Sequence, residues 1–251
     1  MGLFKKKNKL DSHSMKHGIG LITVSKPTST IAEQFRTIRT NIQFSSADRQ
    51  LKTIVFTSAD PSEGKSSVSA NVAVTWADQG SKVLFIDADL RRSTVHRTFR
   101  VSNKQGLTTI LTAQKADLNE SIQKTEVDNL YVLPSGPIPP NPSELLNSTK
   151  MNQLLQVLAG KFDMIILDVP PVNTVTDAQI LASKVDGVVL VVPQGVAIKG
   201  AVLRARDLLE KVHANLLGAV LNRVTDADSG GYYGGYYGGY YGGYYGTDDK
   251  K

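Results

Sequence analysis

The sequence predicts an α/β fold with a mostly parallel central sheet and helices on both faces. Six strand-like runs alternate along the chain with helix-length segments, and the strand-like runs are nearly continuous apolar stretches. Continuous apolar strands are typical of sheets that are covered on both faces, and regular alternation of strands and helices favours parallel pairing. With 251 residues, 41% of them hydrophobic, the chain is long enough for one large domain.

The predicted elements follow in order along the chain. A first amphipathic helix is expected over 29–45, because isoleucine and phenylalanine recur there at the spacing of one helix face. The strand-like runs lie at 52–58, 82–89, 129–136, 162–169, 186–193 and 216–222, and the later helical segments at 65–79, 106–113, 144–160, 177–184 and 199–213. We therefore expect a folded domain over 26–225, a basic flexible leader over 1–25 and a disordered tail over 226–251.

Composition limits the classes of function. The chain has no cysteine, which excludes disulfides and thiolate metal sites. Its apolar runs are too short for a membrane span, and the amino terminus lacks the apolar core of a secretory signal, so we expect a cytoplasmic protein. The net charge is +6, with four lysines in the first ten residues. These lysines favour either a solvated basic tip or attraction to an anionic membrane leaflet, and no nucleic-acid partner is expected because no aromatic residues are interleaved with them.

A phosphate-binding loop is predicted after the first strand. Residues 59–66 read A-D-P-S-E-G-K-S, which is the pattern G-x-x-x-x-G-K-[ST] with alanine in first place. Backbone N–H groups of such a loop and of the following helix converge on phosphate oxygens. Gly64 allows close approach of the backbone, Lys65 would meet the β- and γ-phosphates, and Ser66 would be a Mg²⁺ ligand. Ala59 requires a backbone conformation that alanine tolerates.

Carboxylates close two other strands. Asp87 and Asp89 end the second predicted strand on one side of the chain, and Asp168 ends the run at 162–169. Ligands of parallel sheets bind beyond the carboxyl ends of the strands, so these three side chains are expected beside the phosphate loop. Carboxylates there suit metal organisation and proton acceptance. Asp163, at the opposite end of its strand, is interpreted as structural.

The end of the chain is a repeat of tyrosine pairs and glycine pairs. Eight of the nine tyrosines lie there, at Tyr232, Tyr233, Tyr236, Tyr237, Tyr240, Tyr241, Tyr244 and Tyr245. Half of this segment is glycine and none of it is aliphatic, so no folded element is expected. Its phenol groups are either part of a merely adhesive tract or acceptors for a chemical reaction.

These residues together resemble a known family. G-K-S, a D-x-D pair and a third aspartate followed by proline resemble the deviant Walker class of nucleotide-binding proteins, a subgroup of P-loop NTPases. Within that class the chain is similar to bacterial tyrosine kinases that regulate capsular and exopolysaccharide synthesis. The narrower resemblance rests on four stretches: E-Q-F-R-T-I-R-T-N-I-Q-F at 33–44, S-E-G-K-S-S-V-S-A-N-V-A-V at 62–74, S-G-P-I-P-P-N-P-S-E-L-L at 135–146 and the terminal tyrosines. Departures from the family pattern are Ala59, Ser62 in place of glycine and Ser93 in place of proline.

The resemblance implies a protein-tyrosine kinase that uses ATP and Mg²⁺ and phosphorylates its own tail. It implies catalytic roles for Lys65, Asp87, Asp89 and Asp168, with Asp87 near the incoming phenol, and Mg²⁺ organised by Ser66, Asp89 and Asp168. The nucleotide-binding residues would be Asp60, Ser62, Glu63, Gly64, Lys65, Ser66, Ser67, Asn222 and Arg223. Arg91 and Arg92 either offset γ-phosphate charge or are solvated arginines.

The resemblance also implies partners. Glu33, Arg36 and Arg39 form E-x-x-R-x-x-R on one side of the first helix, and in this family that pattern joins subunits into a ring. Other implied partners are a separate transmembrane activator, which would hold the kinase at the inner face of the membrane, tyrosine-containing substrates and a phosphotyrosine phosphatase. Two other functions are weighed against this one: a positioning or partition ATPase of the same class, and an adaptor with an inactive body.

Overall fold

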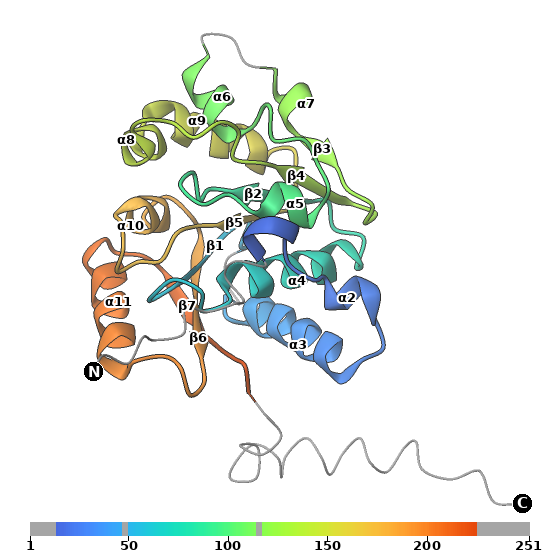
Figure 1. The fold of residues 1–251 in the computed structure, drawn as a ribbon, viewed down its shortest axis with the longest axis vertical. Helices are drawn as coiled ribbons and strands as arrows, with labels where there is room; N and C mark the ends of the chain where they lie inside the picture. The colour runs from blue at the N-terminus through green and yellow to red at the C-terminus, as the bar shows by residue number, and fades with distance from the viewer. Residues whose placement is uncertain (1–13, 47–49, 114–116, 225–251) are drawn as a thin grey trace, which may run out of the picture.

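The fold, seen in a computed structural model, is a single seven-stranded sheet with helices on both faces (Figure 1). The structure describes residues 14–46, 50–113 and 117–224. The strands are β1 Thr53–Ser58, β2 Val83–Asp87, β3 Gln123–Lys124, β4 Leu130–Leu133, β5 Met164–Asp168, β6 Gly187–Pro193 and β7 Leu216–Asn222. The helices are α2 Ile22–Ser25, α3 Thr30–Phe44, α4 Lys65–Ala77, α5 Val95–Thr98, α6 Leu107–Thr112, α7 Leu118–Ser121, α8 Pro142–Asn147, α9 Thr149–Ala159, α10 Asp177–Ala182 and α11 Lys199–Lys211.

The sheet order brings the predicted site together. The strands lie in the order β3-β4-β2-β5-β1-β6-β7, and every pair is parallel except β3 with β4. Strand β5 therefore lies between β1 and β2, and Asp87 pairs in register with Asp168. Because parallel strands end at the same edge of a sheet, the phosphate loop after β1 and the acidic ends of β2 and β5 meet there.

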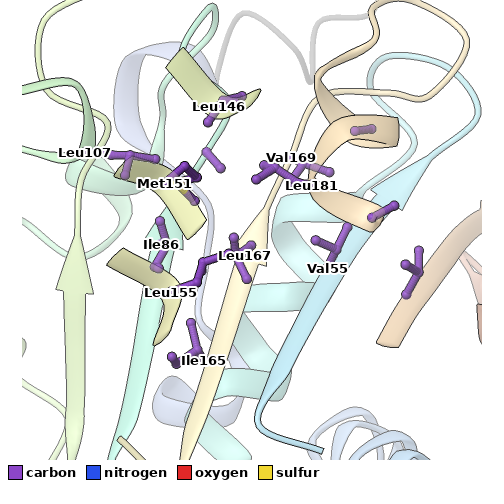
Figure 2. Packing of buried hydrophobic residues seen from close by; sticks show 14 of the residues in the cluster. Val55, Ile86, Leu107, Leu146, Met151, Leu155, Ile165, Leu167, Val169 and Leu181 are labelled. Carbon is purple, nitrogen blue, oxygen red and sulfur yellow. The ribbon is translucent and has the colours of Figure 1, made fainter. Parts of the chain in front are cut away.

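Each face of the sheet has its own core. One hydrophobic cluster contains Val55, Ile165 and Leu167 and is covered by α9 and α10. The apolar residues next to them in the sequence belong to a second cluster on the opposite face, together with residues of α4. Figure 2 shows Met151 and Leu155 over the side chains of β2 and β5. Side chains of a strand alternate between its two faces, so burial of both faces explains the continuous apolar runs. The edge strand β7 differs, because several of its residues are exposed.

The structure corrects some predicted boundaries. The helix expected over 144–160 is two helices, α8 and α9, separated at Ser148. Ser148 has an extended backbone (φ −66°, ψ 154°), and its hydroxyl oxygen caps α9 by accepting a hydrogen bond from Met151 N. Serine competes with helical hydrogen bonding in this way, which apolar periodicity does not reveal. The short elements α5, α7 and β3 were not predicted, because two to four residues carry no measurable period.

Packing begins before residue 26, where the leader was expected to end. Thr23 is 3% exposed, and its backbone N and hydroxyl both donate to Asn71 Oδ1 of α4. Gly18 (φ 75°) fits so closely against α5 that a Cβ there would lie 2.5 Å from Thr98 N. Residues 18–25 therefore contact α4, which follows the phosphate loop, and α5, which follows the acidic end of β2.

Candidate active site

The phosphate loop connects β1 to α4 as the sequence predicts. Ala59 is fully buried and is absent from the described residues with positive φ, so alanine is tolerated in first place. The left-handed positions are Ser62 (φ 65°) and Gly64 (φ 94°). Only Gly64 is the residue type that such a backbone favours.

Ser62→Gly is therefore expected to stabilise the protein. A left-handed backbone costs a residue with a Cβ roughly 1 kcal/mol, and glycine avoids this cost. The added chain entropy of glycine offsets part of the gain, so we expect about 0.5 kcal/mol in the free energy of unfolding. Urea denaturation of both proteins measures this difference. A loss of stability would mean that the Ser62 side chain makes contacts worth more than the strain.

Asn222 and Arg223, which are predicted to bind the nucleotide, contact the phosphate loop. Asn222 Nδ2 donates to Glu63 O at 3.1 Å, and Arg223 Nη2 donates to Ser62 O at 2.6 Å. Asn222 Oδ1 accepts from Arg223 N at 2.9 Å, so both ends of the amide are engaged. A Cβ on Gly64 would lie 2.2 Å from Asn222 Nδ2. The end of β7 thus contacts the loop. The amide of Asn222 keeps a second N–H and a second lone pair, so its predicted contact with the nucleotide stays a prediction.

Lys65 and Ser66, at the start of α4, face the carboxylates of the neighbouring strands. Lys65 Nζ lies 3.3 Å from Asp168 Oδ1 and 3.4 Å from Asp89 Oδ2. Ser66 Oγ donates to Asp168 Oδ2 at 2.5 Å. Burial alone lowers the pKa of Lys65, but the surrounding carboxylates, Asp168 first, raise it above its ordinary value. Lys65 is therefore a fixed positive charge at neutral pH.

Asp87 is fully buried at the end of β2. Its Oδ2 accepts from Ser93 Oγ at 2.8 Å and from Val95 N at 3.3 Å. Its Oδ1 has no hydrogen-bond partner among the described residues. Burial and then the carboxylate of Asp168 raise the pKa of Asp87 to about 7. A carboxylate with this pKa accepts a proton more readily than an ordinary aspartate does, as catalytic carboxylates often do.

The oxygen atoms of this site fit Mg²⁺. One hydroxyl (Ser66) and two carboxylates (Asp89 and Asp168) lie around Lys65, and Asp87 Oδ1 is a buried acceptor without a partner. Mg²⁺ prefers oxygen ligands, retains several waters and is commonly shared with substrate phosphates. Over the residues that the structure describes, no group of three or more His, Cys, Asp or Glu side chains is placed to hold a metal ion alone. The set therefore fits a cation held by Ser66 together with phosphates, with the carboxylates acting through water.

The chain is similar in sequence and fold to known proteins. Residues 51–217 match the family described as AAA domain. The chain is 46% identical to the tyrosine-protein kinase YwqD of Bacillus subtilis, over 85% of this chain and 90% of that protein. Among solved structures, the kinase domain of the Escherichia coli tyrosine kinase ETK is 37% identical, with a TM-score of 0.77 and 85% of each chain covered.

The chain belongs to the bacterial tyrosine-protein kinase family. The cell division ATPase MinD of Pyrococcus furiosus is also similar, at 29% identity over 70% of this chain and 75% of that one, with a TM-score of 0.60. The kinases are more similar in sequence and cover more of the chain. The match therefore confirms the predicted P-loop, nucleotide-binding fold and supports the kinase over the positioning ATPase.

The remaining loop residues of the kinase shape its backbone. Glu63 is 4% exposed, and its Oε2 accepts from Asp60 N at 3.0 Å. Burial raises the pKa of Glu63. Asp60 O accepts from Ser58 Oγ, and Ser67 O accepts from Asn71 Nδ2 within α4. The Glu63 side chain therefore points at the loop backbone, and a direct role of Asp60 and Ser67 with nucleotide stays a prediction.

The E-x-x-R-x-x-R residues of the kinase divide between surface and core. Glu33 and Arg36 form an ion pair on the exposed side of α3. Arg39 is 8% exposed, and its Nη1 donates to Thr75 O of α4 at 2.7 Å. The spacing of three does not place all three on the surface, because Arg39 lies on the edge of α3 that packs against α4. Arg39 therefore contacts α4 of its own chain, whereas Glu33 and Arg36 are at least partly exposed, and the subunit contact of these residues stays a prediction.

Two arginines and two residues missed from the sequence complete the surroundings of the kinase site. Arg91 is not simply a solvated arginine, because it binds the buried carboxylate of Asp177, and its role in offsetting γ-phosphate charge stays a prediction. Ser143 also binds Asp177. Ser143 lies in the segment 135–146, for which no site role is predicted, and Asp177 lies in no recognised motif. Arg92 is exposed, and its backbone N donates to Asp89 Oδ1 at 3.0 Å. Asp163 accepts from Lys82 N at 2.8 Å, in line with a structural role.

Two predicted features lie outside the described residues: the lysines of the first ten positions and the eight tail tyrosines. Among the described helices of the kinase, none is long and apolar enough to cross a membrane.

Proposed function

We propose that this kinase transfers the γ-phosphoryl group of ATP, with Mg²⁺, to tyrosines of its own carboxyl-terminal segment. The observation that carries the proposal is the pairing of a buried lysine with carboxylates at the end of the phosphate loop. In the same chain, eight of nine tyrosines stand in the last 20 or so residues. The site thus supplies a place for phosphate, and the sequence supplies acceptors.

Each residue has a part that follows from its surroundings. Lys65 and the loop amides bind the phosphates, because a fixed cation and backbone donors offset charge on phosphate oxygens. Ser66, Asp89 and Asp168 would hold Mg²⁺, which neutralises charge that develops on the transferred group. Lys65 and Ser66 both contact Asp168, so binding of phosphate would exchange these contacts for contacts with the nucleotide.

Asp87 is the proposed acceptor of the tyrosine proton. A phenol has a pKa of about 10, so it arrives protonated. The phenolic oxygen forms the new bond to phosphorus, the bond to the oxygen of the departing ADP breaks, and the phenolic proton passes to Asp87 Oδ1. The transition state of phosphoryl transfer is loose, so orientation of the hydroxyl counts for more than early removal of its proton. The unpartnered Oδ1 of Asp87 suits that task.

Transfer in trans within a ring is part of the proposal. Of the three E-x-x-R-x-x-R residues of α3, Glu33 and Arg36 are at least partly exposed and can meet a neighbouring subunit. A glycine-rich segment of about 25 residues has a mean span of some 25–30 Å, on the order of one subunit radius. Tethering in a ring raises the local concentration of acceptor to about the millimolar range, so little sequence-specific recognition of each tyrosine is needed.

Mixing two full-length variants tests transfer in trans. One carries Lys65→Met and all tail tyrosines, and the other has an intact site but phenylalanine at the eight tail positions. With ATP and Mg²⁺, mass spectrometry is expected to find phosphate on the tail of the Lys65→Met chain. Each variant alone should stay unmodified. If the mixture stays unmodified while wild-type protein alone phosphorylates its tail at a rate independent of protein concentration, the transfer occurs within one chain.

The wider setting is proposed from the family. The kinase would act in the cytoplasm, at the inner face of the membrane, through a separate transmembrane activator. Its phosphorylation state, reset by a phosphotyrosine phosphatase, would regulate capsular or exopolysaccharide synthesis. Proteins with accessible tyrosines are further substrates. The four lysines near the amino terminus would add weak, salt-dependent attraction to anionic lipids.

A further inference from the structure

Asp177, in the first turn of α10, is a buried carboxylate surrounded by donors from two other elements. It is 0% exposed. Arg91 Nε donates to Oδ2 at 2.9 Å and Arg91 Nη2 to Oδ1 at 3.2 Å, which is a two-pronged contact. Ser143 Oγ donates to Oδ1 at 2.6 Å, and Arg91 Nη2 also donates to Ser143 Oγ at 3.1 Å. A buried carboxylate is costly unless it is fully paired, and here each oxygen has a donor.

The arginine of this cluster belongs to the turn that follows the second aspartate of the site. Asp89 Oδ1 accepts from Arg92 N at 3.0 Å, which closes the turn, while Asp89 Oδ2 faces Lys65 at 3.4 Å. Leu90 is 1% exposed in the core. The side chain of Arg91 is therefore the connection between this turn and α10, 86 residues further along the chain.

We propose that Asp177 is a positioning residue, which fixes Arg91 and through it the turn that aims the Asp89 carboxylate at Lys65 and the metal site. The proposal rests on the role of Asp89 in the proposed function. Both prongs of the guanidinium are engaged, so Arg91 is held in one orientation, as forked contacts with carboxylates require. Ser143 fixes the Asp177 carboxylate in turn and extends the connection to α8. The cluster thus joins the turn after β2 to α8 and α10.

Asp177→Asn and Arg91→Lys in the full-length chain test this role. Asparagine removes the charge of Asp177, and lysine keeps the charge of Arg91 but loses the fork. Mutation of a residue that orients a metal-binding side chain typically lowers metal affinity or activity about 10–100-fold. In both variants we expect the Mg²⁺ concentration for half-maximal tail phosphorylation to rise about 10-fold, with the KM for ATP at saturating Mg²⁺ unchanged. Asp207→Asn is the matched control, because it breaks the exposed ion pair of Asp207 with Arg206, and it should match wild type.

Hydrogen exchange supplies a second readout that does not depend on activity. Without ATP or Mg²⁺, amides of residues 89–95 should exchange faster in both variants, while those of β1 and β5 keep wild-type protection. Unchanged Mg²⁺ dependence and unchanged exchange in Arg91→Lys would overturn the proposal. A raised KM for ATP with normal Mg²⁺ dependence would also overturn it, since Arg91 would then be a phosphate contact.

A variant that fails to fold, a failure of the proposed function and a failure of the role of Asp177 give different results. If Asp177→Asn does not fold, the Arg91→Lys variant alone tests the proposal, because the Arg91 side chain is 39% exposed and a substitution there disturbs the core less. If wild type transfers no more phosphate than Lys65→Met, the proposed function fails. If wild type is active and the variants equal it in both readouts, the proposed function stands and only the role of Asp177 is lost.

Discussion

Lys65→Met is expected to abolish phosphorylation of the tail, with a loss of at least about 100-fold in rate. The side chain of Lys65 is 13% exposed and lies against Asp89 and Asp168. The carboxylates keep it charged, so it is a preorganised cation at the point where phosphate charge arrives. Methionine has a similar length and no charge, so the variant removes the electrostatic contribution and leaves the packing of α4 largely in place.

The measurement is time-resolved phosphorylation with ATP and Mg²⁺, together with binding of a fluorescent nucleotide. Lys161→Met is the matched control, since Lys161 is exposed in the turn after α9. It should phosphorylate its tail at the wild-type rate. If Lys65→Met retained wild-type activity, the lysine would have no role in transfer, and the carboxylate cluster would need another explanation. If it bound nucleotide normally but transferred nothing, Lys65 would act on the transition state alone.

Asp87→Asn is expected to lower kcat by about 10²–10⁴-fold, which is the range for loss of a general base. The KM for ATP should stay within about threefold of wild type, because the hydrogen-bond partners of Asp87 are Ser93 and Val95 rather than residues of the phosphate loop. Asparagine has the shape of aspartate and retains the acceptor for Ser93 Oγ. It then places the amide NH2 group, which is a donor, where the unpartnered Oδ1 stands, so the phenol loses its proton acceptor.

Stability separates this effect from misfolding. Asp87, Asp89 and Asp168 stand together, and the burial of Asp87 beside Asp168 raises the pKa of Asp87 to about 7. Removing one negative charge from this cluster relieves repulsion, so Asp87→Asn should unfold at the same or a higher urea concentration than wild type at pH 8. Lower activity with equal stability supports the proposed role. An unchanged kcat would show that Asp87 is not the group that receives the phenol.

The sequence was sufficient for the fold class and for the centre of the site. Buried parallel strands are nearly continuous apolar runs, so their ends are visible in the sequence, and Asp87, Asp89 and Asp168 stand at two of those ends. The phosphate loop is a local motif of a few consecutive residues, which is why Lys65 and Ser66 were placed correctly beside those carboxylates. Local periodicity and motif spacing contain this information without any knowledge of partners.

Only the tertiary structure decided which distant residues serve the site. Arg91 meets Asp177 across 86 residues, and Asn222 meets the loop at Glu63 across 159 residues. These contacts follow from the order of the strands, with β5 between β1 and β2 and with β6 and β7 on the other side of β1, which apolar patterns do not encode. The direction of Arg39 into α4 depends in the same way on how two helices pack. The sequence thus determined the groups that can do chemistry, and the packing of distant elements determined which side chains hold those groups in place.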